Sequence, residues 1–84
     1  MYTCPCCGYK TLEEPHEYDI CPICYWEDDL YQFKNVDSTG ANNVSLRKAQ
    51  KNYLEFGACD QSVLKFVRSP EKYDIKDKEW NPLD

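Results

Sequence analysis

The sequence predicts a small α+β domain in which a cysteine-bearing β-hairpin packs against two helices in the C-terminal half. Three observations predict it. The unit Cys-Pro-x-Cys occurs twice, at residues 4–7 and 21–24. Short β-prone runs lie between the two copies, and residues 44–68 show the three- and four-residue apolar spacing of helices. At 84 residues the chain can build one core, so we expect a single domain over residues 1–84.

The hairpin is expected between the two Cys-Pro-x-Cys units. Residues 9–12 and 18–20 are the β-prone runs, and residues 13–16, Glu-Glu-Pro-His, have the composition of a turn. A hairpin that begins at one unit and ends at the other brings all four of their outer cysteines to the same end. Residues 1–26 therefore form the predicted ribbon, and residues 69–84 form a charged tail.

Helix signals follow in the second half. Ser45 is a good N-cap, and Gly57 suits the left-handed position that ends a helix. Asp60 can cap a second, shorter helix that Pro70 stops after residue 67. The apolar stripe of the first helix consists of Leu46, Ala49, Tyr53 and Phe56.

The strongest signal is the spacing Cys4-x2-Cys7-x13-Cys21-x2-Cys24. Two cysteines three residues apart on a tight turn direct both sulfurs at one point, and four thiolates suit the tetrahedral, soft-ligand preference of zinc. We therefore predict one structural zinc ion on these four residues. A single redox iron is the alternative, because the same spacing also holds iron.

The residue after each second ligand influences its turn. Gly8 relieves the strain of a positive φ in the first unit. Tyr25 occupies the corresponding position in the second unit, which predicts a less regular turn there.

Two further cysteines are not expected to bind the metal. Cys6 aligns with the apolar Ile23 of the second unit, which favours a small buried hydrophobe. The alternative is a reactive thiol beside a bound cation, where a lowered pKa would make it a nucleophile or redox sensor. Cys59 is likewise predicted to be a packed small residue, and a disulfide with Cys6 has no support in the pattern.

Other conspicuous residues have more than one interpretation. His16, the only histidine, is expected to face solvent in the turn, away from the metal end. Trp26 is interpreted as a core or metal-shielding aromatic residue. The acidic residues 27–29 favour a solvated loop, with a contact surface for a basic partner as the alternative. Trp80 in the tail either docks on the body or serves a partner.

Charge and composition exclude several functions. Residues 1–40 contain eight acidic and only two basic side chains, which disfavours nucleic-acid binding.

The chain shows no secretory signal and no apolar run long enough to span a membrane, so we expect a cytoplasmic protein without a membrane partner. In such a reducing compartment, paired cysteines indicate metal ligands before disulfides. No nucleophile and base pattern is present, so we expect no enzyme.

The sequence resembles the cysteine-rich CPCC family of small bacterial proteins. The motifs that carry the resemblance are Cys-Pro-Cys-Cys-Gly-Tyr at 4–9, Glu-Tyr-Asp-Ile-Cys-Pro-Ile-Cys-Tyr-Trp-Glu-Asp-Asp at 17–29, Gly-Ala-Asn-Asn-Val-Ser-Leu at 40–46 and Asn-Tyr-Leu-Glu-Phe-Gly-Ala-Cys-Asp at 52–60. The resemblance implies a zinc-ribbon-like module and no established activity. Where that family often shows Gly after Pro15, this chain has His16, which disfavours a ligand role for the histidine.

The function expected from these features is a protein–protein interaction module stabilised by zinc, with a partner that the sequence does not name. A thiol-redox or electron-transfer protein that uses Cys6 and Cys59, or an iron at the four-cysteine site, is the main alternative. An acidic, immunity-type protein that neutralises a toxin also fits the size and charge.

Overall fold

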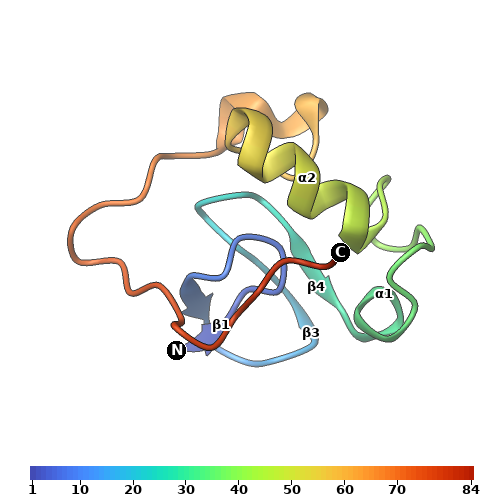
Figure 1. Cartoon of the computed structure of the whole chain (residues 1–84), viewed down its shortest axis with the longest axis horizontal. Coiled ribbons are helices and arrows are strands. Elements are labelled where there is room, and N and C mark those ends of the chain that lie inside the picture. Colours follow the sequence, from blue (N-terminus) through green and yellow to red (C-terminus); the bar gives the residue numbers. More distant parts are fainter.

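The computed structural model describes residues 1–84 and has the predicted α+β architecture (Figure 1). It contains two small antiparallel sheets, two α-helices and one 3-10 helix. In chain order these are β1 (Tyr2–Thr3), β2 (Lys10–Leu12), β3 (Glu17–Ile20), β4 (Glu27–Asp29), α1 (Leu30–Lys34), α2 (Leu46–Phe56) and the 3-10 helix η1 (Gln61–Phe66). Together with a cluster of four cysteines, this arrangement is consistent with a zinc-ribbon-like fold.

The strand pairing differs from the prediction. β2 and β3 do not pair with each other; β1 pairs with β2, and β3 pairs with β4. Each hairpin is closed by one Cys-Pro-x-Cys turn, called a knuckle below. The Cys4 N–H donates to the Tyr9 carbonyl and the Cys21 N–H donates to the Trp26 carbonyl, at 2.8 and 2.9 Å. These bonds extend each ladder up to the first cysteine of its knuckle. The chain therefore reverses its direction within the knuckle.

Residues 13–16 connect the two hairpins instead of closing one. The backbone N–H groups of Glu13 and Glu14 both donate to Asp19 Oδ2 at 3.1 Å. His16 adopts a positive φ of 61°, and its N–H donates to Asp28 Oδ2 at 2.6 Å. Carboxylates of β3 and β4 therefore hold the connection in place.

The acidic segment after Trp26 is not a solvated loop, and that prediction is wrong. Asp28 and Asp29 are 1% and 5% exposed, within β4. Asp29 caps α1 by accepting from the Tyr31 N–H at 2.8 Å, and its other oxygen accepts from the Ala41 N–H at 2.9 Å. Their carboxylates accept hydrogen bonds from backbone N–H groups, so these two residues are not part of a solvated acidic surface.

A buried amide network orders the segment that follows α1. Gln32 donates to the carbonyls of Ser38 and Val44, each at 2.9 Å, and accepts from the side chain of Asn42 at 2.9 Å. Asn42 also bonds both backbone groups of Glu27. Every polar atom of the two amides has a partner. The network therefore fixes the turn-rich segment between α1 and α2 in one conformation.

The first predicted helix is confirmed. The Ser45 hydroxyl accepts from the Lys48 N–H at 3.1 Å, and Gly57 has the left-handed φ of 86°. The second helix is present as the 3-10 helix η1, which ends at Phe66. Asp60 does not cap it with its side chain as predicted; its backbone carbonyl instead accepts from the Val63 N–H at 3.2 Å. This spacing of three residues is the bond of a 3-10 turn.

The charged tail docks on the body, which decides between the two interpretations of Trp80. The Trp80 Nε1–H donates to the Pro5 carbonyl at 2.9 Å, and the Asp77 N–H donates to the Gly8 carbonyl at 2.8 Å. The Leu83 N–H donates to Gln50 Oε1 on α2 at 2.7 Å. Figure 1 shows this red segment running past β1 to the start of α2.

The core lies between the knuckles and α2. Trp26 is fully buried there, as its core interpretation predicted. The cluster comprises Cys4, Cys6, Cys7, Leu12, Cys21, Ile23, Cys24, Trp26, Leu46, Ala49 and Cys59. None of the helices has the length and apolar character needed to cross a lipid bilayer.

Candidate metal centre

The two knuckles have the same backbone geometry. Gly8 has a φ of 82° and donates its N–H to the Cys4 carbonyl at 2.9 Å. Tyr25 has a φ of 69° and donates to the Cys21 carbonyl at 2.7 Å, so the expected irregularity of the second turn is absent. A left-handed residue with a Cβ costs about 1–2 kcal/mol. The Tyr25 ring stacks on Phe66 at 5.0 Å, a contact that offsets part of this cost.

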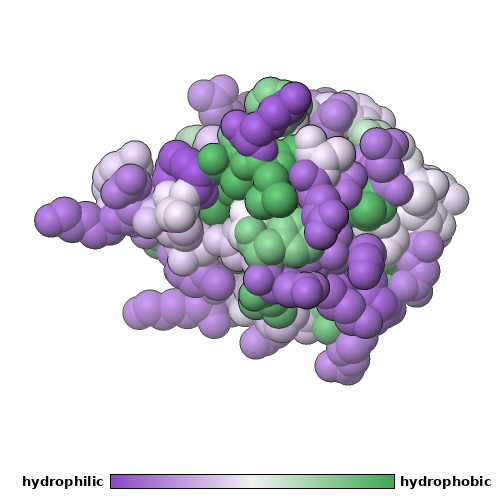
Figure 2. All heavy atoms as spheres, turned by 90° about the horizontal axis from the view of Figure 1, so that it is seen from above, coloured by the Kyte–Doolittle hydropathy of each residue, from purple (hydrophilic) through white to green (hydrophobic).

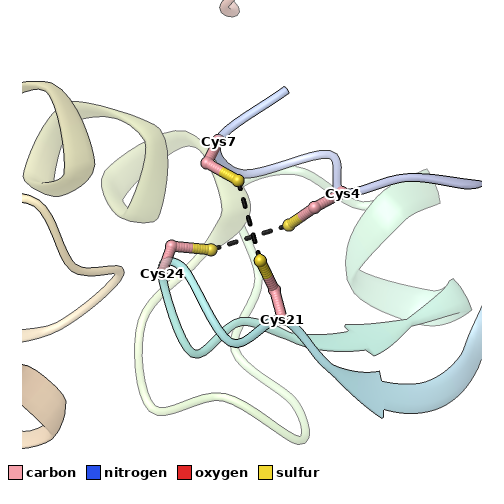
Figure 3. Close-up of side chains that lie close together, drawn as sticks. All are labelled: Cys4, Cys7, Cys21 and Cys24. Atoms are coloured by element: carbon pink, nitrogen blue, oxygen red, sulfur yellow. Dashed lines mark hydrogen bonds between the residues drawn. The ribbon is translucent and has the colours of Figure 1, made fainter. Parts of the chain in front are cut away.

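The knuckles bring the four sulfurs of Cys4, Cys7, Cys21 and Cys24 together (Figure 3). Sulfur separations are 3.6 Å between Cys4 and Cys24 and 3.7 Å between Cys7 and Cys21, and all four lie within 4.8 Å of one another. Zinc–sulfur bonds of about 2.3 Å in a tetrahedron place sulfurs about 3.8 Å apart, whereas a disulfide requires about 2.05 Å. The arrangement therefore fits a four-coordinate metal ion and does not fit disulfides.

The centre is closed to solvent. All four cysteines are 0% exposed. Backbone carbonyls anchor both knuckles from outside: that of Pro5 accepts from the Gln50 side chain at 2.8 Å, and that of Cys24 accepts from the Cys59 N–H at 2.9 Å. A tetrahedral ion held here would have no open coordination position for water or substrate, which is typical of a structural site.

Three thiols of the centre, those of Cys4, Cys21 and Cys24, have strongly shifted pKa values. Burial raises the pKa of Cys4 and Cys24 well above the usual value. Hydrogen bonds from the neighbouring thiols, that of Cys24 first, lower the pKa of Cys21, and the Thr11 hydroxyl adds a bond at 3.1 Å. One thiolate is thus favoured by the protein's own donors. A bound divalent cation would supply the charge needed to ionise Cys4 and Cys24.

The two remaining cysteines lie in the core, as their apolar interpretation predicted. Cys6 is fully buried, as is its counterpart Ile23. Cys59 is also buried, and desolvation by this burial raises its pKa to about 12. Both thiols are free, so the disulfide between them is not formed. Low exposure removes the main requirement of a reactive cysteine.

His16 lies apart from the sulfur cluster, as expected, but it does not simply face solvent. Its side chain is 30% exposed, its Nδ1 lies 3.5 Å from Asp28 Oδ1, and its ring lies 4.5 Å from that of Phe33. This histidine–carboxylate pair was missed because the sequence predicted that residues 18–20 pair with residues 9–12. In the structure β3 pairs with β4 and Glu17 lies opposite Asp29, which brings the neighbouring residues His16 and Asp28 together.

These features define a small α+β protein with a buried four-cysteine cluster that could hold a metal ion. The model of the cysteine-rich CPCC family matches residues 2–74, so the chain belongs to this family, as the motifs had indicated. All four clustered cysteines, His16 and Asp28 lie within the matched range, whereas residues 75–84 lie outside it. None of the curated proteins matches the chain.

Proposed function

We propose that this chain is a protein–protein interaction module whose fold is stabilised by one structural zinc ion. The observation that carries the metal assignment is the convergence of four fully buried sulfurs at separations of 3.6 and 3.7 Å. Zinc suits the site better than iron because it is redox-inert and prefers four-coordinate thiolate sites in structural roles. The closed geometry supports stabilisation of the fold over catalysis, and we propose no enzymatic activity.

Elemental analysis and absorption spectroscopy test the metal. One zinc per chain in a colourless protein supports the proposal. One iron per chain with visible charge-transfer absorption would replace zinc by a redox iron and favour electron transfer.

The interaction role is supported by apolar side chains exposed on the helical part. Leu54 on α2 is 66% exposed, and Leu64 and Phe66 on η1 are also exposed. Figure 2 looks down on this side of the molecule and shows apolar residues gathered in its middle with hydrophilic residues around them. Apolar surface framed by polar residues is typical of contact sites between proteins.

Cross-linking in cells, compared between matched variants, tests this role. Leu54→Lys should abolish a cross-linked partner that the natural protein retains, while Lys51→Ala on the same helix should retain it. Both residues are exposed, so neither variant should unfold the protein. Identical cross-linked products from both variants and the natural protein would contradict an interaction site on this face.

The other candidate functions have less support. Thiol redox chemistry needs accessible sulfurs, and Cys6 and Cys59 are buried. Nucleic-acid binding would need a continuous basic face. The basic residues of the helical part, residues 44–68, are Arg47, Lys48, Lys51, Lys65 and Arg68. Two of them are already paired, Arg47 with Asp37 and Arg68 with Asp74, each at 2.7 Å. No contact on the surface favours a toxin-neutralising role over other interactions. We propose that the module acts in the cytoplasm, where its thiols stay reduced.

A further inference from the structure

The largest cavity of the protein lies away from the metal centre. It has a volume of about 530 Å³ and lies between the first knuckle, the residue 13–16 connection, the start of α2 and the docked tail. This volume is within the range of ligand sites in proteins.

His16 lines this cavity, and its ring is held by neighbouring side chains. Its Nδ1 is buried and faces Asp28 Oδ1 at 3.5 Å, and neither atom has a hydrogen-bond partner of normal length. Its Nε2 also makes no hydrogen bond and is not fully buried. Phe33 holds the ring from another side, and the His16 N–H bond to Asp28 fixes the backbone.

The buried carboxylate determines which nitrogen carries the proton. A lone pair on Nδ1 would face the Asp28 carboxylate and be repelled, whereas a proton there is attracted to it. The neutral imidazole is therefore favoured as the Nδ1–H tautomer, which leaves Nε2 as the hydrogen-bond acceptor.

The rest of the lining favours a cation. Asp77 and Glu79 from the tail add two carboxylates to that of Asp28, and no lysine or arginine lines the cavity. Aromatic rings of Tyr2, Phe33 and Trp80 form part of its walls. Carboxylates and aromatic faces together are the usual environment of bound ammonium and guanidinium groups.

We propose that this cavity binds the ammonium or guanidinium group of a lysine or arginine side chain of a partner protein, with His16 Nε2 accepting one of its hydrogen bonds. Asp28 is a positioning residue that fixes the imidazole tautomer. The assignment of the ligand to a protein rests on the proposed interaction function. The net charge of −5 favours such a basic partner.

Heteronuclear NMR titration of the metal-loaded protein tests the proposal. The probe N-acetyl-arginine amide should shift the His16 and Trp80 side-chain resonances with a dissociation constant on the order of 1 mM. Its neutral isostere N-acetyl-citrulline amide should bind at least about tenfold more weakly. Equal binding of the two probes would overturn the cation site. So would a titration in which acetate shifts these resonances and the arginine probe does not. Equal or tighter binding of free butylammonium relative to an arginine-containing tripeptide would overturn its assignment to a protein partner.

The variant Asp28→Asn tests the positioning role. Its side-chain oxygen can still accept the His16 N–H, while its amide can donate to Nδ1 and move the imidazole proton to Nε2. We expect the ¹⁵N signature of His16 to change from the Nδ1–H to the Nε2–H tautomer, with affinity for the arginine probe reduced about tenfold. Glu55→Gln on α2 makes the same change in net charge outside the cavity. It should leave both the His16 tautomer and the affinity for the arginine probe unchanged.

A second variant keeps the test decisive if Asp28→Asn does not fold. His16→Asn tolerates the positive φ of this position and removes the imidazole, so it should also lose about tenfold in affinity. Unchanged affinity in His16→Asn, or a natural protein with the Nε2–H tautomer, would overturn the proposal. If the arginine probe does not bind but the Leu54-dependent partner is still cross-linked, this inference fails and the proposed function stands.

Discussion

The indole of Trp80 lies directly against Gly8 in the first knuckle. A Cβ built on Gly8 would lie 2.6 Å from Cε3 of that ring, and Gly8 also requires its positive φ of 82°. The Trp80 Nε1–H bond to Pro5 holds the indole over the same turn. The tail therefore covers the knuckle that supplies Cys4 and Cys7. A glycine is needed at position 8 for two separate reasons, the positive φ and the close approach of the Trp80 ring.

Two glycine variants separate these reasons. Gly57 has a φ of 86° and nothing within 4 Å of its added Cβ, so Gly57→Ala should cost only the strain of about 1–2 kcal/mol. Gly8→Ala should cost at least about 1 kcal/mol more, because overpacking adds to the same strain. Urea unfolding of the metal-loaded proteins measures both. Adding Trp80→Ala to Gly8→Ala should give a less than additive loss, and full additivity would contradict the contact.

Metal removal should unfold the knuckles. A structural zinc site contributes an apparent 10–16 kcal/mol, as much as the whole stability of about 5–15 kcal/mol expected for a domain. Cys21→Ser should therefore lose stoichiometric metal and cooperative melting. Cys6→Ala removes an equally buried sulfur from the first knuckle and should lose only about 1 kcal/mol. Circular dichroism during melting, with and without chelator, measures these effects.

The comparison of the two cysteines decides the ligand set. Equal damage from Cys21→Ser and Cys6→Ala would contradict the assignment of Cys6 to the core. A melting curve unchanged after complete metal removal would contradict a structural metal altogether.

Local rules predicted the parts of this structure that depend on neighbouring residues. The cap at Ser45, the left-handed glycines at 8 and 57, and the convergence of the paired cysteines all follow from turn and helix geometry over a few positions. The strand pairing was predicted wrongly because the β-prone runs carry no register signal. Each knuckle is itself the turn of a hairpin, so the strand after it pairs with the strand before it.

The buried polar residues could not be predicted because charge patterns describe composition and not surroundings. Asp28 and Asp29 read as solvent-exposed beside Glu27, yet they accept hydrogen bonds from His16, Tyr31 and Ala41. The His16 and Ala41 donors come from other segments of the chain, whereas Tyr31 follows Asp29 by only two residues. Burial of an acidic residue becomes visible only when the fold shows which backbone groups need an acceptor.

Thiol accessibility gives a third prediction. In the metal-loaded protein no cysteine should react with a thiol reagent at pH 8, because all six are buried and a pKa of about 12 leaves Cys59 almost entirely protonated. Chelation in denaturant should expose all six. Titration with a chromogenic disulfide counts the reactive thiols in the native protein and in the chelated, denatured protein. Rapid reaction of Cys6 or Cys59 in the native protein would contradict this packing and favour a thiol-redox function.

Removal of the buried amide at position 32 should be strongly destabilising. Gln32→Ala leaves the carbonyls of Ser38 and Val44 and the backbone N–H of Asn42 without a partner. Each lost partner costs about 1–3 kcal/mol, so we expect a total loss of about 3 kcal/mol or more. Gln61→Ala, at an exposed position of η1, should cost less than about 0.5 kcal/mol. Similar unfolding midpoints for the two variants in urea would contradict the network.

Acid should release the tail from the body. The Thr3 hydroxyl and the Glu79 N–H donate to Asp77 and hold the pKa of its carboxyl below the usual range, and Arg68 does the same for Asp74. A carboxyl whose pKa is lower in the folded than in the unfolded chain stabilises the fold above the unfolded value of about 3.9. This contribution is lost as pH falls through the lower, folded value. The Trp80 indole resonance should therefore lose its docked position below about pH 4.

A variant at neutral pH separates this effect from loss of the metal, because acid also protonates metal-bound thiolates. Asp77→Asn removes the charge that Thr3 and Glu79 stabilise, so the Trp80 indole N–H should exchange faster with solvent at pH 7 while the metal stays bound. Glu55→Gln makes the same charge change on the exposed side of α2 and should leave this exchange rate unchanged. Equal protection of the indole in both variants would show that the Asp77 carboxylate does not hold the tail, and that the contact of Trp80 with Pro5 and Gly8 suffices.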